Sequence, residues 1–215
     1  MHPSGRRHRM SDTKPNQKSL TSYYRWHAQI YDLTRWAFLF GRRKLIHRAA
    51  SQVIMPERIL EIGCGTGKNL VELAECFPKA QIIGLDLSQD MLDRARPKLQ
   101  RYGPRVGLMH QAYEAPIAIG AKFDLIVFSY SLSMINPGYD KVLDICKQDL
   151  SDRGTVAIVD FHESRWDWFR RWMGVNHVRM EGQVLEHLRT RFQPLICQVH
   201  HGYGDLWRYL LYIGR

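Results

Sequence analysis

The sequence has few of the features that mark membrane-spanning, secreted or metal-binding proteins. No stretch reaches the 18 or more consecutive apolar residues of a membrane-spanning helix, and the polar start has no apolar run typical of a secretory signal. No repeat of fixed period is present. The four cysteines lie far apart, and none forms a C-x-x-C pair or a Cys/His pair with metal-ligand spacing: Cys64, Cys76, Cys146 and Cys197. We therefore expect reduced thiols, no metal site and a cytoplasmic location.

The composition is that of an ordinary globular chain with an excess of positive charge. Its 215 residues are 45% hydrophobic and 24% charged, which excludes collagen-like, coiled-coil and wholly disordered proteins. The net charge of +10 favours anionic partners. Residues 1–20 carry +4 of it and lack apolar periodicity, so we expect a disordered basic tail there. Residues 21–215 are predicted to form one domain, with an N-terminal helical lid (21–52) and an α/β core (53–215).

Short apolar runs alternate with helical patterns along the core. Such alternation predicts an α/β fold with a doubly wound, Rossmann-like sheet of seven strands, mostly parallel, with an antiparallel hairpin strand at the C-terminus. The predicted strands are Arg58–Ile62, Gln81–Leu85, Val106–Met109, Phe123–Phe128, Thr155–Val159, Leu195–His200 and Leu206–Ile213. A helix is expected to begin at Asn136-Pro137.

The most informative segment is the glycine-rich turn between the first strand and its helix. It reads Glu61-Ile62-Gly63-Cys64-Gly65-Thr66-Gly67. Glycines allow left-handed backbone and a close ligand approach, and the following helix offers unpaired N–H groups. The next strand ends at Asp86, where nucleotide-binding α/β folds hold ribose hydroxyls. A dinucleotide fingerprint would need glycine at position 68, which is Lys68.

The pattern E-x-G-x-G-x-G resembles motif I of the class I S-adenosylmethionine-dependent methyltransferases. The resemblance implies that S-adenosyl-L-methionine is the cofactor, that the glycine loop holds its amino-acid end, that Glu61 organises the loop and that Asp86 binds the ribose. The sequence departs from the family after the third strand, where His110–Glu114 contains no Asp for the adenine amino group. The predicted cofactor-binding residues are Tyr24, Glu61, Gly63, Cys64, Gly65, Gly67, Asp86, Leu87, Met91, Tyr113, Glu114 and Ser129.

Two further stretches resemble the diacylglyceryl-homoserine N-methyltransferases of betaine-lipid synthesis. They are Ile30–Arg35, followed by Phe40-Gly41-Arg42, and Phe128–Ile135. Val159–Phe161 and His201–Tyr203 also fit. The resemblance implies N-methylation of a lipid-linked homoserine amine and a partner enzyme that supplies the aminobutyrate headgroup.

An amine acceptor must be neutral to attack, so it needs a general base or a proton relay. The candidates lie where the fourth and fifth strands end, and the predicted catalytic residues are Tyr31, Tyr130 and His162, with Ser129 and Asp160 nearby in the chain. Tyr24 and Tyr31 would cap the cofactor, and an aromatic face attracts a methylammonium charge. Ordinary packing of an amphipathic helix is the alternative for Tyr31.

A membrane surface suits such an acceptor. Trp166, Phe169, Trp172 and Met173 fall on one helical face with arginines beside it, a composition typical of interfacial helices that bind anionic lipids. This predicts a peripheral location at the inner membrane leaflet. The alternative is that these aromatic residues pack onto the sheet.

Other functions stay open at this point. A small-molecule methyltransferase with a soluble polar amine, acid or hydroxyl acceptor would need no lipid. RNA modification would use the positive charge, but no N/D-P-P-[YF] tetrapeptide follows the fourth strand, which counts against nucleic acid. A cofactor-binding scaffold that activates a partner enzyme is the non-enzymatic alternative.

Overall fold

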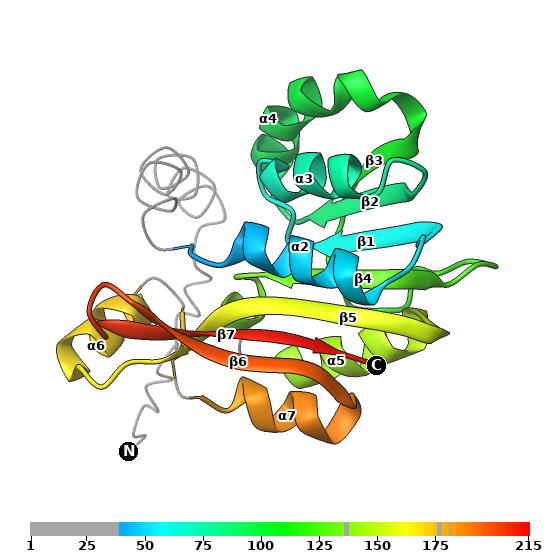
Figure 1. The fold of residues 1–215 in the computed structure, drawn as a ribbon. Helices are drawn as coiled ribbons and strands as arrows, with labels where there is room; N and C mark the ends of the chain where they lie inside the picture. The colour runs from blue at the N-terminus through cyan, green and yellow to red at the C-terminus, as the bar shows by residue number, and fades with distance from the viewer. Residues whose placement is uncertain (1–38, 136–137, 176–177, 181) are drawn as a thin grey trace, which may run out of the picture. The chain divides into compact units, whose positions relative to one another are not determined.

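The computed structural model describes residues 39–135, 138–175, 178–180 and 182–215, which build one sheet with helices on both faces (Figure 1). Its strands are β1 (Arg58–Ile62), β2 (Gln81–Asp86), β3 (Val106–His110), β4 (Phe123–Ser129), β5 (Leu150–Glu163), β6 (Pro194–Gly202) and β7 (Trp207–Gly214). They lie in the order β3-β2-β1-β4-β5-β7-β6, and β7 runs antiparallel to both of its neighbours. The predicted fold class is therefore confirmed.

The strand order creates a switch point between β1 and β4, where the chain turns from building one half of the sheet to the other. In open α/β sheets ligands bind outside the carboxyl ends of the strands at such a point. The carboxyl ends of β1, β2, β4 and β5 are thus the edge at which a functional site is expected.

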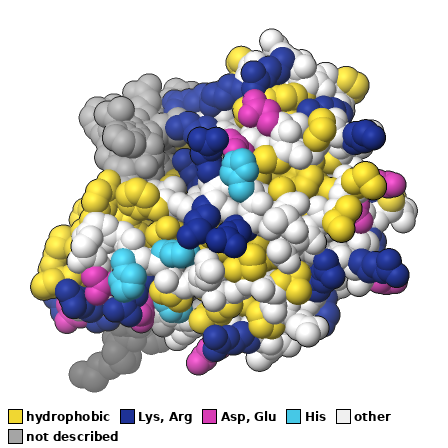
Figure 2. Space-filling model, viewed as in Figure 1, with side chains coloured by type: hydrophobic (Ala, Val, Ile, Leu, Met, Phe, Trp, Pro, Cys, Tyr) yellow, Lys and Arg dark blue, Asp and Glu magenta, His cyan; other side chains and the backbone are white. Residues whose placement is uncertain are grey.

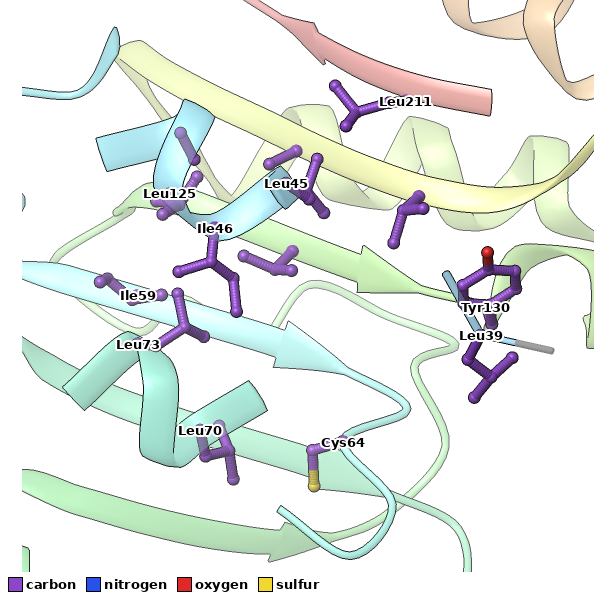
Figure 3. Close-up of a cluster of buried hydrophobic side chains, with 14 of the residues drawn as sticks. Leu39, Leu45, Ile46, Ile59, Cys64, Leu70, Leu73, Leu125, Tyr130 and Leu211 are labelled. Carbon is purple, nitrogen blue, oxygen red and sulfur yellow. The ribbon is translucent and has the colours of Figure 1, made fainter. Parts of the chain in front are cut away.

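Helices from different parts of the chain cover the two faces of the sheet. They are α2 (Arg42–Gln52), α3 (Lys68–Cys76), α4 (Gln89–Leu99), α5 (Tyr139–Asp149), α6 (Asp167–Val175) and α7 (Val184–Arg191), with short 3-10 turns at Gln100–Arg105 and Leu132–Met134. Buried side chains of α2, α3, α4 and α6 form one apolar cluster with the sheet, part of which Figure 3 shows. Those of α5 and α7 form the second cluster on the opposite face.

Strand residues alternate between the two clusters, as the period of a β-strand requires. Ile59 lies in the cluster with α2 and α3, and its neighbour Leu60 lies in the cluster with α5. Leu125 and Ile126 of β4 divide in the same way. Burial on both faces explains why these strands read as unbroken apolar runs in the sequence.

Two details differ from the sequence-based expectations, and a third lies outside the described residues. β5 continues to Glu163 rather than ending at Val159, because its last residues pair with β7 across a register shift between Phe161 and Glu163. Leu39–Gly41 within the predicted helical lid is not helical, and Gly41 has a left-handed φ of 80° before α2 begins. The described part of α5 begins at Tyr139, and the expected start at Asn136-Pro137 lies outside the described residues.

The predicted tail (1–20) and most of the predicted lid (21–38) lie outside the described residues. The domain boundaries at residues 20 and 52 therefore stay predictions. Among the described helices, none has both the length and the apolar character needed to cross a membrane.

Candidate functional site

The turn after β1 depends on its glycines. Gly63, Gly65 and Gly67 have φ angles of 73°, 53° and 74°, a left-handed conformation that other residues adopt at a cost of about 1–2 kcal/mol each. A Cβ atom on Gly63 would lie 2.7 Å from the Cβ of Ser131. The loop is held against β2, because the N–H groups of Gly63 and Cys64 donate to the Leu85 carbonyl at 2.8 and 3.0 Å. The backbone conformation of this turn therefore requires glycine at these three positions.

Glu61 lies under this loop and is fully buried. Its Oε1 atom accepts a hydrogen bond of 2.7 Å from the side-chain amide of Asn69 in the first turn of α3. A buried carboxylate is costly unless it is hydrogen-bonded, so this contact fixes the orientation of the Glu61 side chain. The sequence analysis did not identify Asn69, whose one signal is its place at the start of the helix after the glycine loop.

Asp86 ends β2 beside the same loop. Its Oδ2 atom accepts from the Gly65 N–H at 2.7 Å and its Oδ1 atom from the Ser88 N–H at 2.9 Å. Each carboxylate oxygen can accept more than one hydrogen bond, so both keep capacity for a further donor. The geometry therefore joins Glu61, the glycine loop and Asp86 into one group at the carboxyl edge of β1 and β2.

Four other residues predicted to bind the cofactor are less closely grouped. Tyr113 is buried, and its hydroxyl donates to Asp149 Oδ2 at 2.7 Å. Burial and this carboxylate raise the pKa of Tyr113 well above its usual range. Leu87 and Glu114 are exposed, whereas Met91 is buried in α4. The contacts of these four side chains with a cofactor stay predictions.

Cys64 has its side chain turned into the core between α3 and β2 (Figure 3), where its sulfur would lie 2.9 Å from a Cβ on Gly84. Any contact of Cys64 with a ligand therefore comes from its backbone. Tyr24 and Tyr31 lie outside the described residues.

The end of β4 carries three hydroxyl side chains in succession. Tyr130 is buried with a positive φ of 56°, an uncommon conformation for a bulky residue. Its hydroxyl donates to the Phe40 carbonyl at 2.8 Å, and burial raises its pKa well above the usual range. The hydroxyls of Ser129 and Ser131 on either side are buried without a hydrogen-bond partner among the described residues. Buried polar atoms of this kind indicate a place for a ligand.

Asp160 of β5 is a fully buried carboxylate next to this segment. Its oxygens accept from the N–H of Ser133 at 3.1 Å and the N–H of Phe161 at 2.8 Å. Burial raises the pKa of Asp160 to about 6, while these hydrogen bonds act in the opposite direction. Asp160 thus fastens the turn after β4 to β5.

His162 follows two residues later on β5 and is half-buried. Burial lowers the pKa of its imidazole, and its Nδ1 atom has no hydrogen-bond partner among the described residues. Gly182 covers the ring: its N–H donates to the His162 carbonyl at 2.8 Å, and a Cβ there would lie 3.5 Å from His162 Cε1. Burial therefore disfavours the charged form of this imidazole.

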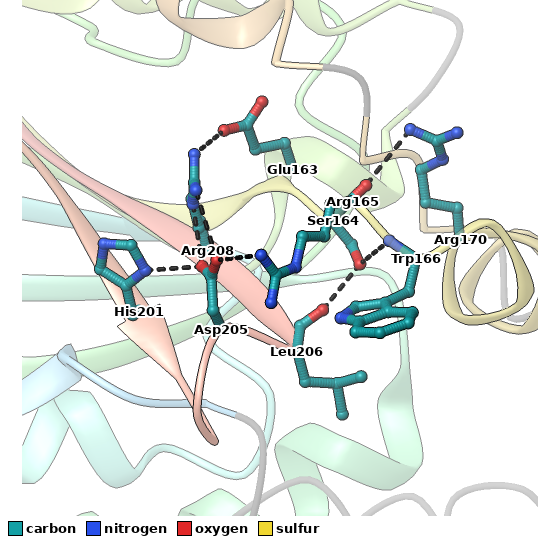
Figure 4. A network of polar contacts seen from close by, with 9 residues as sticks. All are labelled: Glu163, Ser164, Arg165, Trp166, Arg170, His201, Asp205, Leu206 and Arg208. Atoms are coloured by element: carbon teal, nitrogen blue, oxygen red, sulfur yellow. Dashed lines mark hydrogen bonds and ion pairs between the residues drawn. The ribbon is translucent and has the colours of Figure 1, made fainter.

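A second polar cluster, which the sequence analysis missed, lies beyond the end of β5 (Figure 4). Asp205 Oδ1 accepts from Arg208 Nε at 3.0 Å and lies 2.6 Å from His201 Nδ1, and these contacts lower the pKa of Asp205 to about 2. Arg208 also donates to Glu163 at 2.7 Å, and Arg165 lies 3.6 Å from Asp205. A cavity of about 250 Å³ beside this cluster is lined by Glu163, Ser164, Arg165, Arg170, Met180 and Arg208.

The chain is similar in sequence to known methyltransferases. Residues 59–154 match a family described as "Methyltransferase domain". Over 110 residues the chain is 40% identical to a malonyl-[acyl-carrier protein] O-methyltransferase of Legionella pneumophila, covering 47% of this chain and 38% of that protein. The corresponding protein of Priestia megaterium is 31% identical over 147 residues, which cover 68% of this chain and 52% of that one.

The fold is similar to that of a Burkholderia thailandensis 1,6-didemethyltoxoflavin-N1-methyltransferase with bound S-adenosylhomocysteine. The TM-score is 0.70 at 18% identity, covering 96% of this chain and 92% of the other. The chain spans between 38% and 52% of the length of the two curated relatives above.

Proposed function

We propose that this chain, which has the fold and, over residues 59–154, the domain of a class I S-adenosylmethionine-dependent methyltransferase, transfers a methyl group from S-adenosyl-L-methionine to the amine of a lipid-linked homoserine headgroup. The observation that carries the cofactor assignment is the grouping of Glu61, the glycine loop and Asp86 at the switch point of the sheet. The acceptor assignment depends on the two sequence stretches that resemble the betaine-lipid enzymes.

The residues present fit this cofactor. The left-handed glycine loop would hold its amino-acid end and the Asp86 carboxylate its ribose hydroxyls. Ser129 and Ser131, at the carboxyl end of β4, have buried hydroxyls without partners among the described residues. When bound, S-adenosyl-L-methionine supplies an electrophilic methyl carbon on a sulfonium. The protein then has to position the acceptor and exclude water.

The acceptor amine must lose a proton to attack. His162 is proposed to take it, because it lies near the carboxyl end of β5 and its Nδ1 atom is without a partner among the described residues. Tyr130 is assigned a positioning role, since its hydroxyl is committed to the Phe40 carbonyl. Tyr31 is proposed to face the methylammonium product, whose positive charge an aromatic ring attracts.

The identity of the acceptor is supported by Ile30–Arg35 and Phe128–Ile135 together. The same resemblance implies that another enzyme supplies the aminobutyrate headgroup. A lipid-linked acceptor also suits work at the inner membrane leaflet, as the aromatic and basic residues around α6 predict. The net charge of +10 favours such an anionic surface over neutral surroundings.

The test is incubation of the purified protein with methyl-labelled S-adenosylmethionine and either lipid extract or lipid-free metabolite extract of the source cells. The proposal predicts label in a chloroform-soluble quaternary amine. The His162→Ala variant should bind S-adenosylhomocysteine as the wild type does and lose turnover. Label confined to water-soluble products would overturn the acceptor assignment.

A second acceptor class is favoured by one specific finding, the 40% identity over 110 residues to a malonyl-[acyl-carrier protein] O-methyltransferase. In this second possibility the acceptor is a soluble acid, amine or hydroxyl, including an acid carried on a protein. The same experiment distinguishes the two, because this activity needs no lipid and a carboxyl acceptor gives a base-labile methyl ester.

A further inference from the structure

Helix α6 has two apolar sides, and the sheet covers one of them. Phe169 and Met173 are buried, and the Phe169 ring lies 5.8 Å from the ring of Trp207. Trp166 and Trp172, expected on the same side, are 44% and 49% exposed. The expectation of one aromatic face is therefore wrong in part: the helix packs through Phe169 and Met173, and the tryptophans remain outside this contact.

The exposed side forms a stripe along the helix. Trp168, Trp172 and Val175 are 60%, 49% and 73% exposed. Their spacing of four and then three residues puts all three on one side of an α-helix. Figure 2 shows hydrophobic side chains gathered over the region of α6 at the left of the view. We call Trp168, Trp172 and Val175 the α6 apolar stripe.

Three arginines lie within α6 or just before it: Arg165, Arg170 and Arg171. Arg171 is exposed next to Trp172, and Arg165 and Arg170 also line the cavity of about 250 Å³ beyond β5. Asp167, the acidic residue of α6, forms an ion pair with Arg170. Arg165 in turn lies 3.6 Å from Asp205, so these three arginines face two acids. The segment therefore keeps a small net positive charge, which complements an anionic partner.

The position of the stripe relates it to the candidate site. β5 carries Asp160 and His162 near its carboxyl end and leads through Ser164 directly into α6 (Figure 1). The Ser164 hydroxyl donates to the Leu206 carbonyl at 2.6 Å and accepts from the Trp166 N–H at 3.1 Å. These contacts fix the start of α6 close to the strand that carries the proposed base.

We propose that the α6 apolar stripe and its arginines dock the protein on an anionic lipid bilayer, with the tryptophan rings at the level of the headgroups and the arginines on their phosphates. Tryptophan and arginine are the side chains that interfacial helices combine. A folded protein partner is less suited, because a stable protein interface needs about 800 Å² on each partner from about 20–30 residues, and the stripe has three. The role of this surface in methyl transfer to a lipid rests on the proposed function. Its binding to vesicles can be measured whether or not the protein methylates a lipid.

The test is flotation of the full chain with phosphatidylcholine vesicles that contain or lack phosphatidylglycerol. We expect binding to the anionic vesicles and little to the neutral ones. The W168A/W172A variant should lower the partition coefficient by about tenfold or more, because large apolar side chains no longer leave water. The R165Q/R171Q variant should lower it by roughly fivefold for each arginine removed.

Matched controls remove comparable residues elsewhere on the surface. Ile54 and Ile119 are 86% and 93% exposed, and Lys147 and Arg153 are exposed at other positions. The I54A/I119A and K147Q/R153Q variants should bind as the wild type does, and circular dichroism verifies that every variant is folded. Equal binding by W168A/W172A and the wild type, or equal binding to neutral and anionic vesicles, would overturn the proposal.

Methyl transfer is measured on the same preparations. Loss of vesicle binding in W168A/W172A with retained transfer to a detergent-dispersed acceptor supports the docking surface and the proposed function together. Vesicle binding by the stripe without methyl transfer to any lipid supports the docking surface and removes the lipid acceptor.

Discussion

At the scale of single residues, the first prediction concerns Asp86. Replacing it with Asn keeps the size of the side chain but removes the charge that strengthens hydrogen bonds to ribose hydroxyls, each contributing about 1.5–3 kcal/mol. We expect D86N to weaken S-adenosylhomocysteine binding by roughly 10- to 100-fold in isothermal titration calorimetry. D90N, a change in the first turn of α4, should leave the affinity unaltered. An unchanged affinity for D86N would remove Asp86 from the cofactor site.

Asp160 gives a prediction about pH. Its pKa is about 6 in the folded protein, against 3.8 for an ordinary aspartate. A folded-state pKa raised in this way means that folding favours the protonated form of Asp160. The stability that this form contributes is therefore fully present below about pH 3.8 and is lost as the pH rises through 6. We expect the stability of the wild type relative to D160N to fall by about 2–3 kcal/mol between pH 4 and pH 8.

The comparison with D160N is made at each pH, by urea unfolding, because the variant also changes hydrogen bonds with the Ser133 and Phe161 N–H groups. That cost is the same at every pH and cancels in the trend. A flat difference between the two proteins across this range would show that Asp160 titrates as in the unfolded chain.

At the scale of secondary-structure elements, the β1–α3 turn is the most restrictive. G63A places a Cβ in a left-handed conformation and 2.7 Å from Ser131 Cβ. We expect a loss of about 2 kcal/mol or more in the free energy of unfolding. G107A is the matched control, since a Cβ on Gly107 in β3 meets nothing within 4 Å. A similar small loss for both variants would mean that the loop adjusts without strain.

This turn was predictable from the sequence because its constraint is local. Three glycines stand at alternate positions after a buried strand, and an acid stands at the end of the next strand. These local features are sufficient to predict the position of the loop. The strands β1, β2 and β4 were predictable for a similar reason, since burial on both faces leaves continuous apolar runs.

The elements that the sequence did not predict depend on distant partners. Three of the last four residues of β5 are polar, and they become strand by pairing with β7, as Glu163 does with Arg208. Tyr113 can lie in the core because Asp149 accepts a hydrogen bond from its hydroxyl. On α6 the helical period put Phe169 and Met173 on the same face as Trp166 and Trp172, but the division between covered and exposed aromatic residues depends on Trp207 in β7.

The hairpin turn between β6 and β7 gives another prediction about pH. Tyr203, Gly204 and Asp205 all have positive φ, and Asp205 is held by His201 and Arg208. The depressed pKa of Asp205, about 2, means that its contribution to stability is present above about pH 4 and is lost as the pH falls through 2. We expect the melting temperature of D205N to lie below that of the wild type at pH 6 and to approach it near pH 3. A constant difference would assign the effect to the turn geometry alone.

At the scale of the whole molecule, Tyr130 joins parts of the chain that are far apart in sequence. Its hydroxyl bonds to the carbonyl of Phe40, its ring packs edge-on at 4.7 Å against Phe161, and its own N–H donates to Val159. The residue therefore ties the start of α2 to the carboxyl ends of β4 and β5. Y130F removes one hydrogen bond, and we expect the free energy of unfolding to fall by about 1 kcal/mol in urea titrations.

Tyr212 provides a control of the same chemistry, because its hydroxyl donates to the Phe192 carbonyl at 2.7 Å on the opposite face of the sheet. Y212F should cost a similar amount of stability and leave methyl transfer unchanged. If Tyr130 positions the site, Y130F should raise KM and keep the shape of the pH–kcat profile, because His162 still takes the proton. A drop in kcat with a new pH dependence in Y130F alone would instead make its hydroxyl a group that reacts with the acceptor. The pair of variants thus separates the contribution of Tyr130 to folding from its contribution to the arrangement of the carboxyl edge.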